Sequence, residues 1–221
     1  MHATADGAVV VLHDATVDRT TDGTGPVRAL RLAEVQALDA GYRFETPDGA
    51  FPFRGCGVRI PTLAELLAAC PDVALNVEIK QDAPPIEDAV LAVLDRFDAR
   101  QRTLLAAESA AIMARIRARA PDVVTSFSAA EVADFVARLR DGRLAGWSPP
   151  GVALQVPPAW GGVAIVTAES VAAAHAHGVE VHAWTINDEE EMRRLLALGV
   201  DGIMTDFPAR AAAVLGRAGR G

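Results

Sequence analysis

The chain has 221 residues, of which 51% are hydrophobic and only 5% aromatic, so it can bury one sizeable core of mostly aliphatic side chains. Its net charge of −8 at pH 7 argues against a nucleic-acid partner, which would need a basic surface. No apolar run approaches the ~18 residues of a membrane span and no signal peptide is visible, so we expect a cytoplasmic chain with no membrane span.

The first predicted element is an apolar strand over residues 9–12, which follows a turn at residues 2–7. The strand shows no polar alternation, so it needs packing on both faces. It runs directly into His13 and Asp14, and a polar loop with Asp-Gly and Gly-Pro turn signals follows at residues 18–25. In parallel α/β folds the C-terminal rim of a strand is where functional sites are built.

Further strands and helices alternate along the rest of the chain. Strands are predicted at residues 73–79, 103–107, 123–127, 153–156, 163–166, 179–186 and 202–205. Helices are predicted between them, and Thr62 with Glu65 forms a capping-box pattern before one of these. This alternation predicts a parallel α/β fold in a single domain over residues 1–221, with a disordered tail at residues 216–221. A (β/α)8 barrel usually needs ~250 residues, so the chain is slightly short for one.

Four side chains are candidates for chemistry. Histidine side chains can give or take a proton near neutral pH, so His13 is a candidate acid or base; the alternative is a histidine that only hydrogen-bonds at a strand end. Glu78 ends a buried strand, where a carboxylate is costly unless it is paired or binds a metal. Lys80 points to the same side, so an ion pair with Glu78 is a second interpretation, and both can hold. Trp184 ends a late strand, and a core tryptophan is its alternative. Asp14 is better suited to orient the following loop or His13 than to react.

Five segments of the sequence resemble the glycerophosphodiester phosphodiesterase family. The longest is the His-Asp-x-x-x-Asp-Arg-Thr-Thr-x-Gly-x-Gly pattern that begins at His13. The others are Ile-Pro-Thr-Leu-Ala-Glu at 60–65, Asn-Val-Glu-Ile-Lys at 76–80, Ala-Trp-Thr-Ile-Asn at 183–187 and Gly-Val-Asp-Gly-Ile-Met-Thr-Asp-Phe-Pro at 199–208. They occur in the order of the family, and the resemblance as a whole covers about residues 3 to 208.

The resemblance implies a TIM-type (β/α)8 barrel and a phosphoric diester hydrolase. Such an enzyme converts a small-molecule glycerophosphodiester to glycerol 3-phosphate and an alcohol in a metal-assisted, acid/base reaction. It implies that His13 is an acid or base and that Glu78 is a ligand of a hard divalent cation, Ca²⁺ or Mg²⁺. It also implies that Lys80 contacts the phosphate and that Trp184 lies against the glycerol end.

The resemblance also implies that the first two strands of the barrel are absent. In the family these strands carry a first catalytic histidine, a phosphate-binding arginine and two further metal carboxylates. His2 does not replace that histidine, because it falls in the predicted turn and no Arg-Gly follows it. We therefore expect an N-terminally incomplete barrel, an incomplete metal site, and weak or no activity of this chain alone. The alternative is a non-catalytic short form that binds phosphodiesters or a protein partner.

Overall fold

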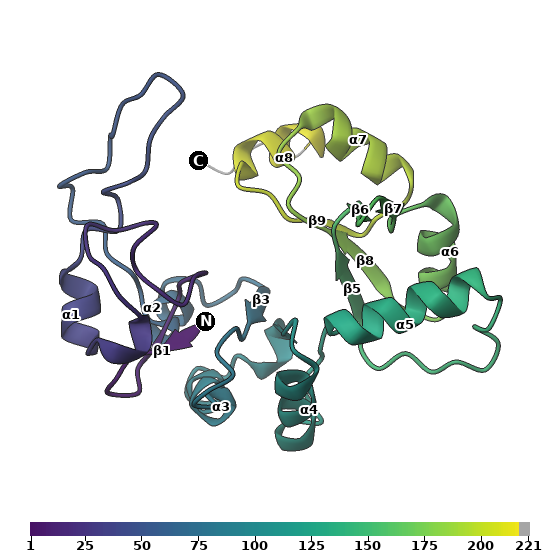
Figure 1. Ribbon diagram of the computed structural model, residues 1–221, viewed down its shortest axis with the longest axis horizontal. Helices are drawn as coiled ribbons and strands as arrows, with labels where there is room; N and C mark the ends of the chain where they lie inside the picture. The colour runs from purple at the N-terminus through teal and green to yellow at the C-terminus, as the bar shows by residue number, and fades with distance from the viewer. Residues whose placement is uncertain (217–221) are drawn as a thin grey trace. The chain divides into compact units, whose positions relative to one another are not determined.

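The computed structural model describes residues 1–216, so residues 217–221 of the predicted disordered tail lie outside the described residues. The chain divides after Val123 into two compact units, which we call the N-terminal and the C-terminal unit (Figure 1). Helices and strands alternate in both units, which confirms the predicted α/β class. The organisation into a single domain stays a prediction.

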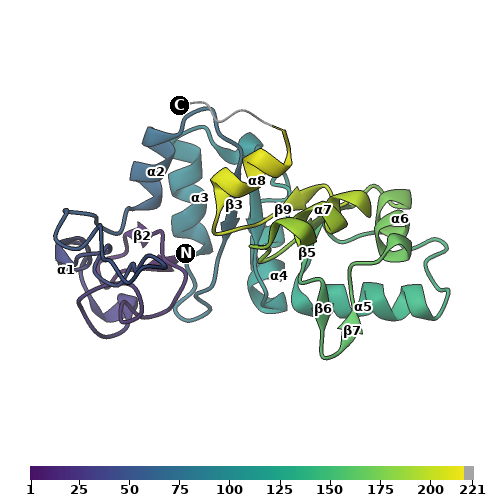
Figure 2. The ribbon, with the colours of Figure 1, turned by 90° about the horizontal axis from the view of Figure 1, so that it is seen from above.

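The N-terminal unit contains one parallel strand pair and a group of helices packed beside one another. Its elements are β1 (His2–Ala3), β2 (Val9–Val10), the 3-10 helix η1 (Val27–Ala29), α1 (Leu32–Ala37), α2 (Leu63–Ala69), β3 (Leu75–Glu78), α3 (Glu87–Arg96), the 3-10 helix η2 (Arg100–Arg102), β4 (Thr103–Ala106) and α4 (Ala110–Arg119). Strands β3 and β4 are parallel, with Glu78 opposite Ala106. Helix α3 contacts both α2 and α4 (Figure 2).

The strand predicted at residues 9–12 is shorter and pairs differently from the prediction. Only Val9 and Val10 form β2, which runs antiparallel to β1 in a hairpin. Gly7, at φ 85°, closes the turn between them in a conformation that side chains disfavour. The predicted packing on both faces is confirmed, because Val9 and Val10 are buried in two different core clusters. The expected C-terminal rim of a parallel strand before His13 is wrong, since apolar content does not reveal strand direction.

The capping box predicted at Thr62 is present at the start of α2. The Glu65 backbone N–H donates to the Thr62 hydroxyl at 3.0 Å, and the Thr62 N–H donates to the Glu65 carboxylate at 2.8 Å. These bonds satisfy two N–H groups that have no partner within the helix. They fix the end of a helix whose Leu63 and Leu67 are buried in the core.

We expect Thr62→Ala to lower the free energy of unfolding by about 1 kcal/mol, because the side-chain acceptor of the cap is lost. Urea denaturation followed by circular dichroism measures the change. Thr62→Ser keeps the hydroxyl and should retain most of the stability. Equal losses in the two variants would show that the methyl group, and not the cap, stabilises this end of α2.

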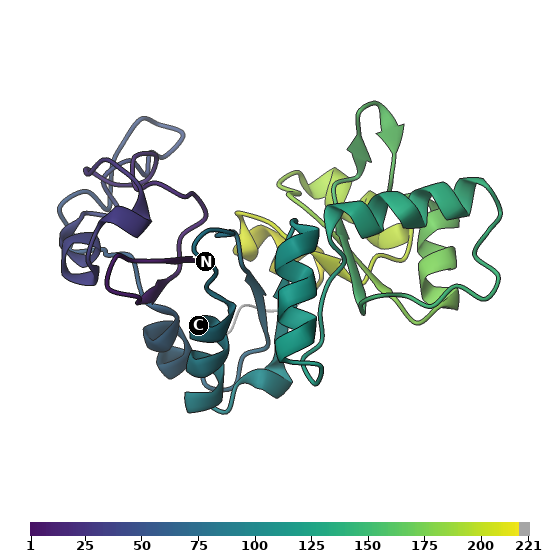
Figure 3. The ribbon, with the colours of Figure 1, turned by 60° about the horizontal axis from the view of Figure 1, so that its bottom comes forward.

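The C-terminal unit is built around three parallel strands. Its elements are α5 (Ala129–Arg140), β5 (Ala153–Val156), β6 (Ala159–Trp160), β7 (Val163–Ala164), α6 (Ala168–Ala176), β8 (Glu180–Ala183), α7 (Glu189–Ala197), β9 (Gly202–Ile203) and α8 (Pro208–Val214). The parallel sheet has the order β5–β8–β9. Helices α5 and α6 contact each other, as do α7 and α8 (Figure 3).

Two predicted strands of this unit have different structures. The segment at residues 123–127 forms isolated bridges instead of a strand, and one of these pairs Ser126 with Ala153 in parallel. The segment at residues 163–166 contributes Val163 and Ala164 to the antiparallel β6–β7 hairpin. Across residues 1–216 the strands form four sheets of two or three strands, and no closed barrel is present in this part of the chain.

None of the helices within residues 1–216 combines the length and the apolar character that crossing a membrane requires.

Candidate functional site

His13 begins a chain of polar contacts just after β2. Its Nδ1 lies 2.7 Å from Asp14 Oδ1, and the side chain of His13 is 71% exposed. Arg19 donates to the same carboxylate through two groups, from Nε to Oδ2 at 2.6 Å and from Nη2 to Oδ1 at 3.1 Å. The fork of Arg19 and the ring of His13 therefore hold Asp14 from two sides. Asp14 therefore contacts both His13 and Arg19 of the following loop, the two partners that it was expected to orient.

The charges of the His13–Asp14–Arg19 contacts determine which ring nitrogen of His13 is available for proton transfer. Hydrogen bonds from Arg19 and His13 lower the pKa of Asp14 to about 2, so its carboxylate is ionised at neutral pH. An ionised carboxylate only accepts hydrogen bonds, so Nδ1 of His13 carries the proton that faces it. In the neutral imidazole Nε2 is then an acceptor, and in the imidazolium it is a donor. His13 thus presents Nε2 for proton transfer.

We expect Arg19→Ala to raise the pKa of Asp14 from about 2 toward its ordinary value of 3.8, because the strongest partner of the carboxylate is lost. A ¹³C carboxyl NMR titration measures this shift, with Arg28→Ala as a control that removes a different arginine. Since the pKa is depressed in the folded state, the contribution of Asp14 to stability is complete above 3.8 and is lost as the pH falls through about 2. An unchanged titration of Asp14 in Arg19→Ala would contradict this assignment.

His2 supports His13 from the neighbouring strand. It belongs to β1 and is only 4% exposed, so its prediction as part of a turn is wrong. Its Nε2 lies 3.1 Å from the backbone oxygen of His13 and donates to it, because a carbonyl only accepts. Burial lowers the pKa of His2, and the positive charge of Lys80 acts in the same direction. A neutral His2 therefore holds the backbone of His13 in place.

Glu78 and Lys80 lie at the end of β3 and are paired. The Lys80 Nζ is 2.8 Å from Glu78 Oε2, which confirms the ion pair that the sequence left open. Lys80 is also the only lysine among the 21 lysine and arginine residues of the chain. An ammonium is a compact point charge, unlike the planar fork of arginine. A single lysine in a chain that otherwise uses arginine indicates a position that requires a compact ammonium.

Strand β1 links the two groups of side chains within the N-terminal unit. One edge of β1 pairs with β2, which precedes His13. Its other edge meets the end of β3, where the Ala3 N–H donates to Gln81 Oε1 at 3.1 Å and the Lys80 N–H donates to the Met1 oxygen at 3.4 Å. The structure therefore gathers His13, Asp14, Glu78 and Lys80 around one short strand.

The residues of this cluster do not fit a complete divalent-metal site. Within residues 1–216 no group of three or more histidine, cysteine, aspartate or glutamate side chains could hold a metal ion. Ca²⁺ takes six to eight oxygen ligands and Mg²⁺ needs near-octahedral geometry, so the single carboxylate of Glu78 is insufficient. Glu78 also has an ammonium at hydrogen-bonding distance. We therefore derive no chemical step through a metal.

Trp184 lies in the C-terminal unit, after β8. Its side chain is 37% exposed, so it is not a fully buried core residue. The backbone N–H of Trp184 donates to the backbone oxygen of Val156 at 3.1 Å, which continues the pairing of β8 with β5. The nearby Asn187 does not cap α7, because Asp188 is the N-cap; Asn187 instead bonds Asp206, with Nδ2 2.8 Å from Oδ2. Trp184 thus presents an indole at a strand end, as predicted.

Comparisons with known proteins agree on one family. The model of the "Glycerophosphoryl diester phosphodiesterase family" matches residues 1–210. A glycerophosphodiester phosphodiesterase of Caldanaerobacter subterraneus subsp. tengcongensis is 30% identical over 212 residues, covering 93% of this chain and 79% of that protein.

Two solved structures share the fold. The glycerophosphoryl diester phosphodiesterase domain of a Mycobacterium tuberculosis protein has a TM-score of 0.84 at 22% identity, covering 98% of this chain and 86% of that domain. An Oleispira antarctica phosphodiesterase, solved in complex with its product sn-glycerol-3-phosphate, has a TM-score of 0.74 at 23% identity, covering 97% of this chain and 82% of that one.

Proposed function

Because the chain belongs to the glycerophosphoryl diester phosphodiesterase family, whose members are phosphoric diester hydrolases, we propose that it hydrolyses glycerophosphodiesters to sn-glycerol 3-phosphate and an alcohol. The observation that carries the proposal is the His13–Asp14–Arg19 chain of contacts, in the same unit as the Glu78–Lys80 pair. It offers a proton-transfer group and a cation, which are two requirements of cleaving a phosphodiester.

His13 is the acid or base of the proposed reaction. In the hydrolysis a water oxygen forms a bond to phosphorus, and the bond from phosphorus to the oxygen of the alcohol breaks. The departing oxygen needs a proton, and Nε2 of a protonated His13 is the available donor, because Asp14 occupies Nδ1. The attacking water loses one proton to solvent, and a proton from solvent returns His13 to its protonated form. Asp14 stays ionised, since its pKa is about 2, and it stabilises the charged ring.

Lys80 is the phosphate-binding group of the proposal. Its ammonium offsets the negative charge that develops on the phosphoryl oxygens in the transition state. Glu78 holds that ammonium in place. A divalent cation, Ca²⁺ or Mg²⁺, would neutralise phosphate charge, but it would need oxygen ligands besides Glu78, so no step of the proposal depends on it. Trp184 is proposed as a wall against the glycerol end of the substrate, because its indole is partly exposed at a strand end.

The identity of the products tests the proposed function. The purified chain is incubated with sn-glycero-3-phosphocholine and Mg²⁺ or Ca²⁺, with a chelator in a parallel reaction, and ³¹P NMR follows the phosphorus. The proposal predicts sn-glycerol 3-phosphate with release of choline. Phosphocholine and glycerol as products would place the cleavage on the other side of phosphorus and would contradict the assignment.

A further inference from the structure

The loop that follows Lys80 is held by side chains. It joins β3 to α3 over residues 79–86, and residues 82–85 form a turn outside both elements. Pro84 and Pro85 lack an N–H, so the loop has few donors of its own. Side-chain contacts add to this turn in fixing the direction of the chain after Lys80.

Gln81 fixes the first part of the loop from inside. Its side chain is only 7% exposed, and both ends of its amide are used. The oxygen accepts from the Ala3 N–H at 3.1 Å, and the Nε2 donates to the Pro84 oxygen at 2.9 Å. Gln81 thus ties the loop to β1 and to itself, but not to the helices behind it.

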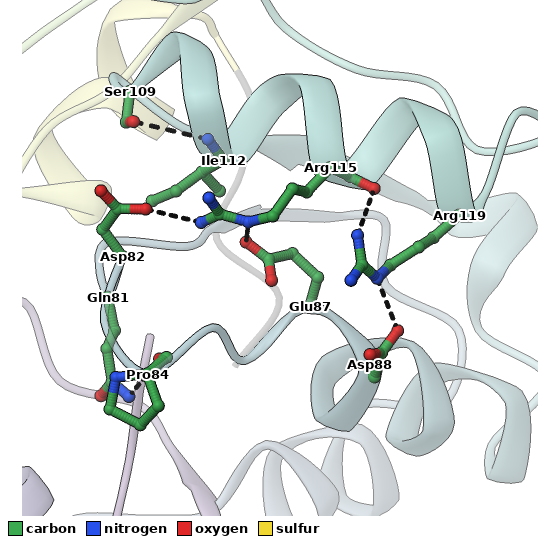
Figure 4. A network of polar contacts seen from close by, with 9 residues as sticks. All are labelled: Gln81, Asp82, Pro84, Glu87, Asp88, Ser109, Ile112, Arg115 and Arg119. Atoms are coloured by element: carbon green, nitrogen blue, oxygen red, sulfur yellow. Dashed lines mark hydrogen bonds and ion pairs between the residues drawn. The ribbon is translucent and has the colours of Figure 1, made fainter.

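Arg115 of α4 connects the loop to the helices, as Figure 4 shows. Its Nη2 donates to Asp82 Oδ1 at 2.6 Å, and its Nε donates to Glu87 Oε1 at 2.9 Å. Glu87 is 1% exposed, and its Oε2 has no hydrogen-bond partner in the part of the chain that the structure describes, so loss of Arg115 would leave a buried carboxylate unpaired there. Asp82 is 60% exposed and tolerates loss of the same contact much better.

A second ion pair on the same helix provides a natural comparison. Arg119, one turn after Arg115, donates to Asp88 Oδ1 at 2.8 Å (Figure 4). Like Asp82, Asp88 is exposed, and its pair also connects α4 to the region of α3. Asp88 lies on α3 itself, however, whereas Asp82 lies two residues after Lys80. Of these two ion pairs, the Asp82–Arg115 pair is the one that holds the segment after Lys80.

We propose that Asp82 is a positioning residue for phosphate binding: through its ion pair with Arg115 it fixes the loop after Lys80 and so holds the ammonium of Lys80 beside Glu78. The inference rests on the proposed function for the role of the ammonium, but the placement of Lys80 is measurable without any substrate. An exposed ion pair contributes little to global stability, so Asp82→Asn should fold normally.

The first experiment observes Lys80 directly. Because Lys80 is the only lysine, reductive ¹³C-methylation of the full chain gives one side-chain lysine signal besides that of the terminal amine. We expect the methyl signal of Lys80 to shift and sharpen in Asp82→Asn, as the side chain gains freedom. We expect Asp82→Glu to restore it partly and Asp88→Asn to leave it unchanged. A Lys80 signal that is the same in Asp82→Asn as in the unaltered chain would overturn the inference, as would equal changes in Asp82→Asn and Asp88→Asn.

The second experiment measures the kinetic consequence with sn-glycero-3-phosphocholine. We expect Asp82→Asn to raise KM by about two- to fivefold with a smaller change in kcat, as is typical of losing one exposed ion pair. Asp88→Asn should leave both constants unchanged. A KM in Asp82→Asn equal to that of the unaltered chain would overturn the inference even though the proposed function stands. If the unaltered chain does not hydrolyse the substrate, the proposed function fails, and the Lys80 signal still decides the placement.

Discussion

Replacing His13 with alanine is expected to lower kcat by about 10²- to 10⁴-fold, the usual contribution of a general acid or base. The alanine removes the only group at this position that can deliver a proton to the departing oxygen. Asp14 cannot substitute, because its pKa of about 2 leaves no proton to give near neutrality. KM should change much less than kcat, since the ring is proposed to act mainly in the transition state. Initial rates over a range of sn-glycero-3-phosphocholine concentrations measure both.

The chain contains a matched control for this variant. His175 also forms a histidine–aspartate pair, with Nε2 2.8 Å from Asp201 Oδ2, but it lies on α6 in the C-terminal unit, outside the recognised motif. His175→Ala should therefore keep kcat within about twofold, as is usual for a surface substitution. A loss in His13→Ala no larger than that in His175→Ala would exclude His13 as the acid or base.

Replacing Lys80 with methionine is expected to lower kcat/KM by about 10²- to 10³-fold, as is typical when one preorganised charge-stabilising group is removed. Methionine keeps most of the length of the side chain but removes the ammonium. Lys80→Arg should recover part of the activity, because it keeps the charge in a different geometry. Steady-state kinetics with sn-glycero-3-phosphocholine measure all three proteins.

Two controls separate the charge of Lys80 from its structural role. Lys80→Met leaves Glu78 without its ion pair, so Lys80→Met combined with Glu78→Gln shows whether an unpaired carboxylate causes the loss. Arg59→Met removes a cation from an exposed pair with Glu65 and should change kcat/KM little. If Lys80→Met retains more than half of the activity, the proposed contact between Lys80 and the phosphate is wrong.

Local features of the fold were predictable from the sequence. The capping box at Thr62 was expected and is present, because it depends on residues only three positions apart. Strand pairing was less predictable. The run at residues 9–12 correctly indicated burial on both faces, but the hairpin of β1 with β2 depends on the turn at Gly7. A run of valines is equally compatible with parallel and antiparallel partners.

The residues of the candidate site also fall into those that the sequence predicts and those that it does not. His13, Glu78, Lys80 and Trp184 were found because each stands in a short motif or at a predicted strand end. His2 was not found, because its role depends on the carbonyl of His13 across a hairpin. Asp82 and Arg115 were also not found, because 33 positions separate them and neither stands in a motif. Contacts between distant segments become visible only when the chain is folded.

Turnover of sn-glycero-3-phosphocholine by the purified chain, compared with His13→Ala at equal concentration, tests the central claim most directly. Both proteins are first shown to be folded, and both are assayed with Mg²⁺, with Ca²⁺ and with a chelator. Our account predicts that the unaltered chain forms sn-glycerol 3-phosphate slowly, in line with the weak activity expected from its sequence, and that His13→Ala loses at least about 99% of that rate. Equal rates in the two folded proteins, or no product from the unaltered chain, would contradict it.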